Sequence, residues 1–231
     1  MYSSISRFFM LVAIFLFAGC ATIRKPLSGI VPGRETETLQ SSISISIKTA
    51  ERSTGGRGYL IFKQPDRFHL AVLSPFGSTL LEVFSDSERL TCLIPSEQTA
   101  YSGLFSELPD RGALNSLALM KWVIERPPLS APLSGPMEIP MADGRTERIY
   151  FDQNGLVQRK VSGDGDEVVY KDYQNVNGVA FPASIEFCNR RGDTVRIVFD
   201  EPEINQAVED VALTPNLQGI TVLPLTEFKG F

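Results

Sequence analysis

Apolar and polar residues alternate along most of the chain. Residues 42–47 alternate strictly between Ser and Ile, which is typical of a strand with one buried and one wet face. Other short apolar runs follow, roughly ten residues apart and separated by turn-forming residues, so we expect an antiparallel meander. The expected strands are 42–47, 58–62, 68–73, 79–84, 90–94, 99–101, 148–151, 156–161, 167–170, 179–188 and 195–199, with Gly55-Gly56 as a turn.

One segment breaks this alternation. Leu114–Ile124 consists mainly of good helix formers, Asn115 or Ser116 can cap its start, and Pro127 ends it. The expected helix is apolar on most sides, so it should cover another element or be covered. Residues 127–144 contain five prolines and are expected to form an extended loop.

A single sheet of about eleven twisted strands must curl or close. We therefore expect an α+β, mainly antiparallel fold: a strongly curved open sheet, or half-barrel, with one covering helix and loops. One helix can cover only part of one face of such a sheet. We therefore expect a partly open apolar concavity. Residues 39–231 suit one domain of this kind.

The turn at Leu73–Thr79 carries an unusual side chain. Pro75 fixes φ, Gly77 permits a positive φ, and the Ser and Thr hydroxyls can bond to nearby backbone, so this stretch predicts a tight turn. Phe76 stands at its tip, where an aromatic ring would face water. Either the ring folds back onto the core or it is kept exposed for an apolar partner.

The N-terminus has the features of a secretion signal. Residues 8–17 are an unbroken apolar run after Arg7, and as a helix they would cover about 15 Å of a bilayer core of about 30 Å, which favours a signal peptide, 1–19, over a membrane span. Leu16–Cys20 resembles the bacterial lipobox, which implies lipidation of Cys20. An ordinary secretory signal or a buried helix is the alternative. Residues 20–38 have no period and are expected to be the lipidated N-terminus and a flexible tether.

Composition excludes several functions. The net charge is −5 and no dense basic cluster occurs, so we expect no nucleic-acid partner. One His and three Cys leave little material for a metal site, and we expect no metal or cofactor. The chain has no Gly-x-Ser-x-Gly elbow, phosphate loop or zinc spacing, so we do not expect an enzyme.

Three further features stay open at this point. Cys92 and Cys188 would both face an oxidising periplasm and can either form a disulfide or remain buried thiols. Asp164-Gly165-Asp166 is explained more simply by a hairpin turn than by a calcium loop. His69 has no evident partner and is expected to be structural or exposed to solvent.

The middle of the chain resembles the LolB family. Asp66–Thr79, followed by Leu81-Glu82-Val83, is similar to that family's Arg-aromatic strand, Asn-Pro-Leu-Gly-Ser-Thr turn and apolar strand, with Phe76 in place of Leu. Leu119–Ile124 resembles the family's Leu-x-x-Trp-aliphatic helix, although the following glycine is missing. Residues 211–222 resemble instead the closing strand of LolA-like proteins, and the tail 208–231 is longer than expected.

The resemblance implies a LolA/LolB-like fold and a lipoprotein on the periplasmic face of the outer membrane. Ala21, the residue after Cys20, also favours the outer membrane by resemblance to enterobacterial lipoprotein sorting. Such a protein binds the acyl chains of lipoproteins in an apolar cavity and helps deliver them into that membrane. Its partners would be the membrane, through lipidated Cys20, lipidated cargo proteins and a periplasmic LolA-like carrier. The alternatives are a scaffolding envelope lipoprotein that binds a protein partner and a LolA-fold lipoprotein sensor.

The resemblance also implies site residues. Pro75, Phe76 and Gly77 would form a membrane-contacting loop. Arg67 would lie at the polar rim of the cavity, unless it is only a solvated strand charge. Acyl chains would contact apolar side chains for which plain core packing is the alternative: Phe62, Leu70, Val72, Leu81, Val83, Leu119, Trp122 and Val123.

Overall fold

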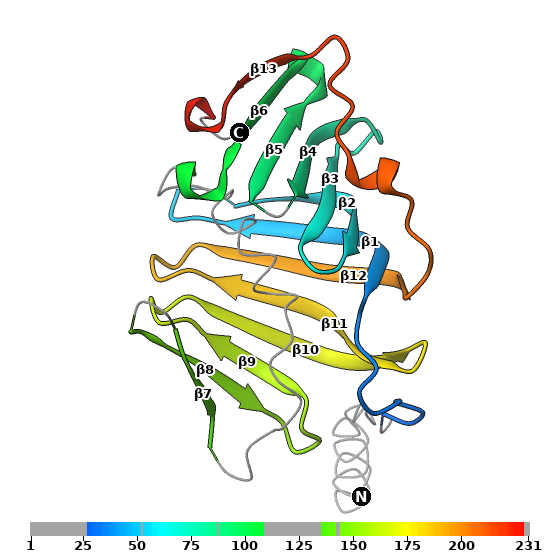
Figure 1. Ribbon diagram of the computed structural model, residues 1–231, viewed down its shortest axis with the longest axis vertical. Helices are drawn as coiled ribbons and strands as arrows, with labels where there is room; N and C mark the ends of the chain where they lie inside the picture. The colour runs from blue at the N-terminus through cyan, green and yellow to red at the C-terminus, as the bar shows by residue number, and fades with distance from the viewer. Residues whose placement is uncertain (1–26, 52, 87, 109–134, 142–143, 229–231) are drawn as a thin grey trace, which may run out of the picture.

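The computed structural model describes residues 27–51, 53–86, 88–108, 135–141 and 144–228 (Figure 1). Thirteen strands form one sheet in the order β13-β6-β5-β4-β3-β2-β1-β12-β11-β10-β9-β8-β7. The strands are β1 (Thr38–Lys48), β2 (Ser53–Lys63), β3 (Arg67–Leu73), β4 (Thr79–Asp86), β5 (Arg89–Ile94), β6 (Thr99–Leu104), β7 (Met137–Pro140), β8 (Thr146–Phe151), β9 (Val157–Val161), β10 (Glu167–Val176), β11 (Val179–Cys188), β12 (Thr194–Ile204) and β13 (Thr221–Pro224). Single 3-10 turns are η1 (Pro95–Glu97), η2 (Phe105–Glu107), η3 (Asp210–Leu213) and η4 (Leu225–Glu227).

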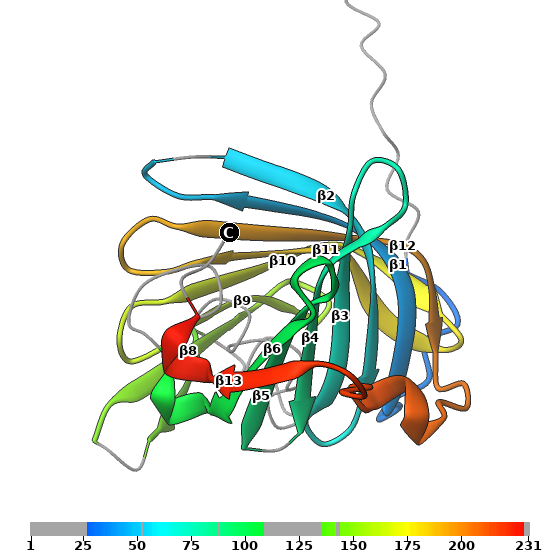
Figure 2. The same cartoon turned by 90° about the horizontal axis from the view of Figure 1, so that it is seen from above.

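The sheet is mainly antiparallel, strongly curved and open. All neighbouring strands are antiparallel except β13 and β6, which run parallel. The two ends of the strand order, β13 and β7, are not paired with each other. Figure 2 shows β3–β6 turning away from the plane of β1, β2, β11 and β12, so that the sheet wraps around one side. The expected mainly antiparallel open sheet is therefore confirmed.

The sheet has two strands beyond the expected eleven. β7 lies inside the stretch 127–144 that was expected to be only loop, and it pairs with β8 through Met137 opposite Ile149. Pro140 is tolerated there because β7 is an edge strand. β13 is a four-residue strand in the C-terminal tail. The expected covering helix, Leu114–Ile124, lies outside the described residues, and no helix in the described ranges is long and apolar enough to cross a membrane.

Gly55 and Gly56 do not form the expected turn. They lie within β2 and pair with Ser46 and Ile45 of β1. The backbone passes closely at this part of the sheet, since a Cβ on Gly55 would lie 3.0 Å from the carbonyl oxygen of Ile45. Close approach, rather than chain reversal, explains the glycines.

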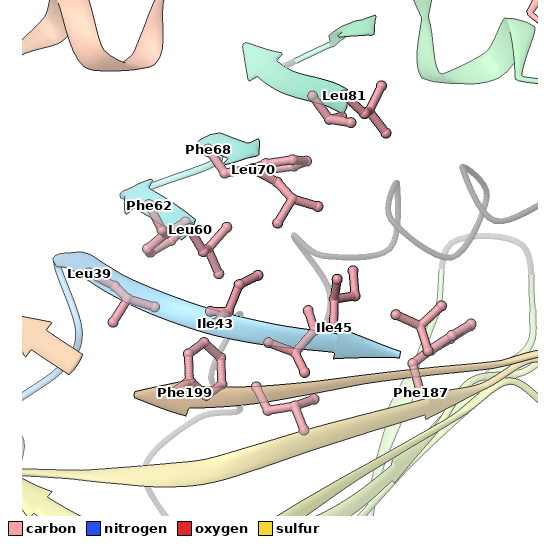
Figure 3. Packing of buried hydrophobic residues seen from close by; sticks show 14 of the residues in the cluster. Leu39, Ile43, Ile45, Leu60, Phe62, Phe68, Leu70, Leu81, Phe187 and Phe199 are labelled. Atoms are coloured by element: carbon pink, nitrogen blue, oxygen red, sulfur yellow. The ribbon is translucent and has the colours of Figure 1, made fainter. Parts of the chain in front are cut away.

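The apolar core lies on the inner face of the curved sheet (Figure 3). Side chains from β2, β3 and β4, such as Phe62, Leu70 and Leu81, point toward those of β1, β11 and β12, such as Ile45, Phe187 and Phe199. They come from alternate positions of each strand, because successive side chains of a strand point to opposite faces. Strict alternation along β1 therefore predicted this face correctly.

The C-terminal segment 205–228, which we call the strap, carries η3, β13 and η4. It leaves β12, contacts β2 and β3 through η3, and then reaches β6, where β13 adds to the edge of the sheet. Arg67 and His69, which alternate with the core residues Phe68 and Leu70, bond to the strap. The strap therefore lies on the outer face of β3.

The expected flexible tether does not extend to residue 38. Asn175 Nδ2 donates to the Ser28 carbonyl at 2.6 Å, and the Val31 N–H donates to the Gly178 carbonyl at 2.8 Å. Asn205 Nδ2 donates to the Glu35 carbonyl, also at 2.8 Å. Residues 28–37 are thus held against the β10–β11 turn and the start of the strap. Their bonding partners lie far away in sequence, which is why local pattern did not predict this contact.

The two cysteines in the described part of the chain are free. Cys92 lies on β5 and Cys188 on β11, with five strands between them. Cys92 belongs to the inner-face cluster, whereas Cys188 follows the inner-facing Phe187 and so points to the other face of the sheet. The disulfide alternative is therefore wrong. Burial raises the pKa of the Cys92 thiol to about 12.

Candidate functional site

The turn between β3 and β4 is held by a dense set of hydrogen bonds. The Ser74 N–H donates to the Ser78 carbonyl at 2.8 Å, and the Gly77 N–H donates to the Ser74 carbonyl at 3.0 Å. The Ser74 hydroxyl oxygen accepts from the N–H groups of Phe76 and Ser78, at 3.3 and 3.1 Å. Gly77 has a φ of +84°, which glycine adopts without steric cost. This local chemistry agrees with the tight turn expected from the sequence.

Phe76 projects from this turn into solvent. Its side chain is 97% exposed, the highest value among the exposed large hydrophobic residues of the described chain. Leu80, the second residue of β4, is 46% exposed. The first alternative considered above, a ring folded back onto the core, is therefore wrong.

Three other hairpin turns whose tips the structure describes have the same backbone hydrogen bonds and a polar tip. In Asp152–Leu156, Ser162–Asp166 and Asn189–Asp193, the first N–H donates to the fifth carbonyl and the glycine N–H donates to the first carbonyl, at 2.8–3.0 Å. Gly155, Gly165 and Gly192 all have a positive φ. The position equivalent to Phe76 holds Asn154, Asp164 and Arg191, all exposed. The backbone of this turn therefore does not require an aromatic residue at its tip.

The expected acyl-contacting residues of β2, β3 and β4 come together on the inner face. Phe62, Leu70, Leu81 and Val83 belong to one buried cluster, and Val72 packs against it. Leu119, Trp122 and Val123 lie outside the described residues, as does Cys20. The first four side chains are only 0–5% exposed, so the described part of the inner face is a buried apolar cluster.

Arg67 is placed differently from the expectation. Its Nη1 donates to Asp210 Oδ1 of the strap at 2.9 Å, and Lys63 Nζ donates to the same oxygen at 2.9 Å. These hydrogen bonds and the two positive charges hold the pKa of the Asp210 carboxyl below its usual value. Because Arg67 faces the strap and not the apolar cluster, the expected place at the cavity rim is wrong.

His69 has a structural partner that the sequence did not show. Its Nδ1 lies 2.9 Å from the Ala212 carbonyl oxygen of the strap, and its ring stacks on Phe84 with centroids 3.9 Å apart. Burial lowers the pKa of the imidazole. Together with Arg67, His69 fixes the strap to the outer face, and neither residue lies near the turn tip. In the Ser162–Asp166 turn, the Asp164 carboxylate forms an ion pair with Arg145.

Comparison with known proteins gives one family match. The family model described as "Outer membrane lipoprotein LolB" matches residues 37–201, which include the Phe76 turn and end before the strap. No curated protein sequence matches the chain.

Solved structures with a similar fold are distant in sequence. A DUF1329 family protein from Desulfovibrio piger ATCC 29098 superposes with a TM-score of 0.58 at 10% identity, covering 78% of this chain and 90% of that one. A LolA superfamily protein from Nitrosomonas europaea superposes with a TM-score of 0.50 at 13% identity, covering 78% of this chain and 91% of that one. At these identities the likeness concerns the fold alone.

Proposed function

The chain belongs to the LolB family of outer membrane lipoproteins, and we propose that it accepts the acyl chains of lipidated proteins and helps deliver them into the outer membrane. The family match and the LolA-superfamily fold support lipoprotein binding and localisation as the general role. The acceptor role, the place of the protein on the periplasmic face and its anchoring through Cys20 belong to the proposal. No bond is broken in such a transfer, so the protein acts without being an enzyme.

The exposed Phe76 carries this proposal. An aromatic ring that is 97% exposed on a rigid turn is unfavourable in water. Three turns of the same backbone geometry hold polar tips, so the ring is not a requirement of folding. Transfer of the ring into lipid contributes roughly 2 kcal/mol, enough to orient the protein on a membrane but not to anchor it.

The inner face supplies the second half of the role. Acyl chains that leave a carrier must be shielded from water, and each Å² of apolar surface removed from water is worth about 25 cal/mol. In the proposal the chains lie against the apolar cluster of Phe62, Leu70, Leu81 and Val83, whose side chains are 0–5% exposed in this structure. A membrane beside the Phe76 turn solvates the chains equally well, so release needs no energy source.

Transfer of a lipidated reporter protein tests the proposal. The full-length protein in vesicles receives the reporter from a periplasmic carrier, and the membrane-inserted fraction is measured over time. We expect Phe76→Glu to slow transfer by at least tenfold, because a carboxylate at the tip cannot enter lipid. Its free energy of unfolding should change by less than about 0.5 kcal/mol, since the side chain makes no packing contact.

Asn154→Glu is the matched control, because it places the same charge on an equivalent turn of the same sheet. It should leave both transfer and stability unchanged. Equal transfer by Phe76→Glu and the unmodified protein would contradict the role of Phe76. Loss of transfer in both variants would point to a general charge effect instead.

A further inference from the structure

The single histidine of the chain, His69, is buried beneath the strap with 7% of its surface exposed. The Ala212 carbonyl can only accept, so the 2.9 Å contact with Nδ1 requires that Nδ1 carries a proton. In the neutral ring, Nε2 is then an unprotonated acceptor. Nε2 is buried without a hydrogen-bond partner, and no other side-chain nitrogen or oxygen in the described part of the chain is in this position.

The surroundings of Nε2 do not suit a protonated ring. Phe84 of β4 stacks on the imidazole, and Tyr59 of β2 meets it edge-on with centroids 5.1 Å apart. Glu82 Oε2 of β4 lies 3.9 Å from Nε2, which is too far for a hydrogen bond. A proton added to Nε2 would therefore be a buried, charged donor without an acceptor, and such a group is costly.

His69 is one of the points that attach the strap to the sheet. The turn η3 lies against β2 and β3, where Asp210 binds Lys63 and Arg67 and the Ala212 carbonyl accepts from His69. Detachment of η3 would place the imidazole in water, where its pKa returns to the ordinary value of 6.5, whereas burial lowers the pKa of the attached ring. The attached state thus binds a proton less readily than the detached state, so acid favours detachment.

The other titratable groups around His69 change charge in other pH ranges or act in the opposite direction. Burial first, and then Glu82, raises the pKa of Tyr59 above 10.0, so the phenol stays neutral. The pKa of Asp210 is held below 3.8, so this anchor weakens only in stronger acid. Burial raises the pKa of Glu82 above 4.5, and its protonation opposes detachment. As the pH falls through 6.5, His69 is therefore the group that favours detachment.

We propose that His69 is an acid-released latch that holds η3 of the strap on the outer face of the sheet. The neutral ring donates through Nδ1 to the Ala212 carbonyl, and a second proton on Nε2 is accommodated once the strap detaches and water accepts the new N–H. Detachment also exposes Leu213 of η3, which is 2% exposed while the strap is attached. The latch thus links pH to an apolar surface, which goes beyond the proposed role in lipoprotein delivery.

Amide hydrogen exchange of the full-length protein in detergent micelles tests the latch. Protection of residues 208–217 is measured by mass spectrometry between about pH 7.5 and about pH 5.5, with correction for the intrinsic pH dependence of exchange. We expect this protection to fall about fivefold to tenfold, because one pH unit below 6.5 about ten exposed imidazoles are protonated for each neutral one. Protection of β1 and β12 should not change, since only the strap detaches.

His69→Gln removes the titrating ring and keeps a side-chain N–H that can donate to the Ala212 carbonyl. Strap protection in this variant should no longer depend on pH over the same range. Asp210→Asn is the matched control, because it weakens the neighbouring anchor to Lys63 and Arg67 and leaves His69 in place. It should lower strap protection at every pH and keep the fivefold to tenfold fall on acidification.

Three results would overturn the inference. Strap protection in the unmodified protein does not change with acid, it rises because protonated His69 pairs with Glu82, or its fall persists in His69→Gln. The first two need no variant and so do not depend on the folding of one. Equal loss of protection in β1 and β12 would mean general unfolding and would also exclude a latch. Because no lipid enters the measurement, each outcome is independent of the proposed function.

Discussion

The Ser74–Ser78 and Asp152–Leu156 turns share a backbone but differ at their tips. Both close with the same two backbone hydrogen bonds and a glycine of positive φ. In both, the first side chain caps the turn: the Ser74 hydroxyl accepts from two N–H groups, and Asp152 Oδ1 accepts from those of Asn154 and Leu156. Only the tip differs, Phe76 against Asn154. The comparison separates what the turn needs in order to fold from what it presents to a partner.

Exchange of the two tips should have the largest effect. The double variant Phe76→Asn with Asn154→Phe keeps composition, charge and both backbones. We expect lipoprotein transfer to fall about 30-fold, the partition effect of roughly 2 kcal/mol, because the ring now lies on a turn at the other half of the sheet. Transfer is measured with the lipidated reporter, and unfolding in urea checks the fold. Full activity of the exchanged protein would show that the position of the ring is irrelevant.

Alanine at the turn glycine tests the shared backbone. At Gly77 and Gly165 a new Cβ would meet nothing within 4 Å, and both residues have a positive φ, +84° and +89°. Each Gly→Ala change should therefore lower the free energy of unfolding by about 1–2 kcal/mol through backbone strain alone. Only Gly77→Ala should also slow transfer, because it redirects the tip. If Gly77→Ala and Gly165→Ala slowed transfer equally, the loss would come from lower stability and not from the direction of Phe76.

Removal of the capping hydroxyl should have a smaller effect. Ser74→Ala removes the acceptor for the Phe76 and Ser78 N–H groups, which water can replace in an exposed turn, so stability should fall by less than about 1 kcal/mol. Transfer should fall by about threefold, because the ring is held less firmly. Ser162→Ala, which removes an acceptor 3.0 Å from the Asp166 N–H, is the matched control. In a Phe76→Asn background, Ser74→Ala should cause no further loss, and an additional loss there would exclude a role through Phe76.

Leucine at the tip should have the smallest effect. Phe76→Leu keeps an apolar side chain of similar transfer free energy, so transfer should stay within about threefold and stability should not change. The reporter assay and urea unfolding measure both. A severe loss of transfer would mean that a partner recognises the aromatic ring itself and that membrane entry is not the cause.

Much of the fold could be predicted because its signals are local. Alternation in β1 identified its buried face, and the Ser-Pro-Phe-Gly stretch identified a tight turn, since a turn is set by the residues within it. Local pattern gave a wrong prediction at Gly55 and Gly56. Two adjacent glycines indicate a turn, but here they lie within β2 and allow close approach of the neighbouring strand. Local pattern also missed β7, because four residues with a proline carry almost no strand signal until β8 lies beside them.

The sequence alone determined eleven of the thirteen strands, the Phe76 turn and the similarity to LolB, because each depends on residues close together in the chain. The tertiary structure alone decided that Phe76 points outward, that Arg67 and His69 hold the strap, that Asn175 and Asn205 shorten the tether, and that Lys160 on β9 is buried. In β9 the lysine stands among Gln158 and Arg159, where nothing distinguishes it from a surface charge. Which face a strand buries is set by the strands beside it, and those pairings join residues that are far apart in the sequence.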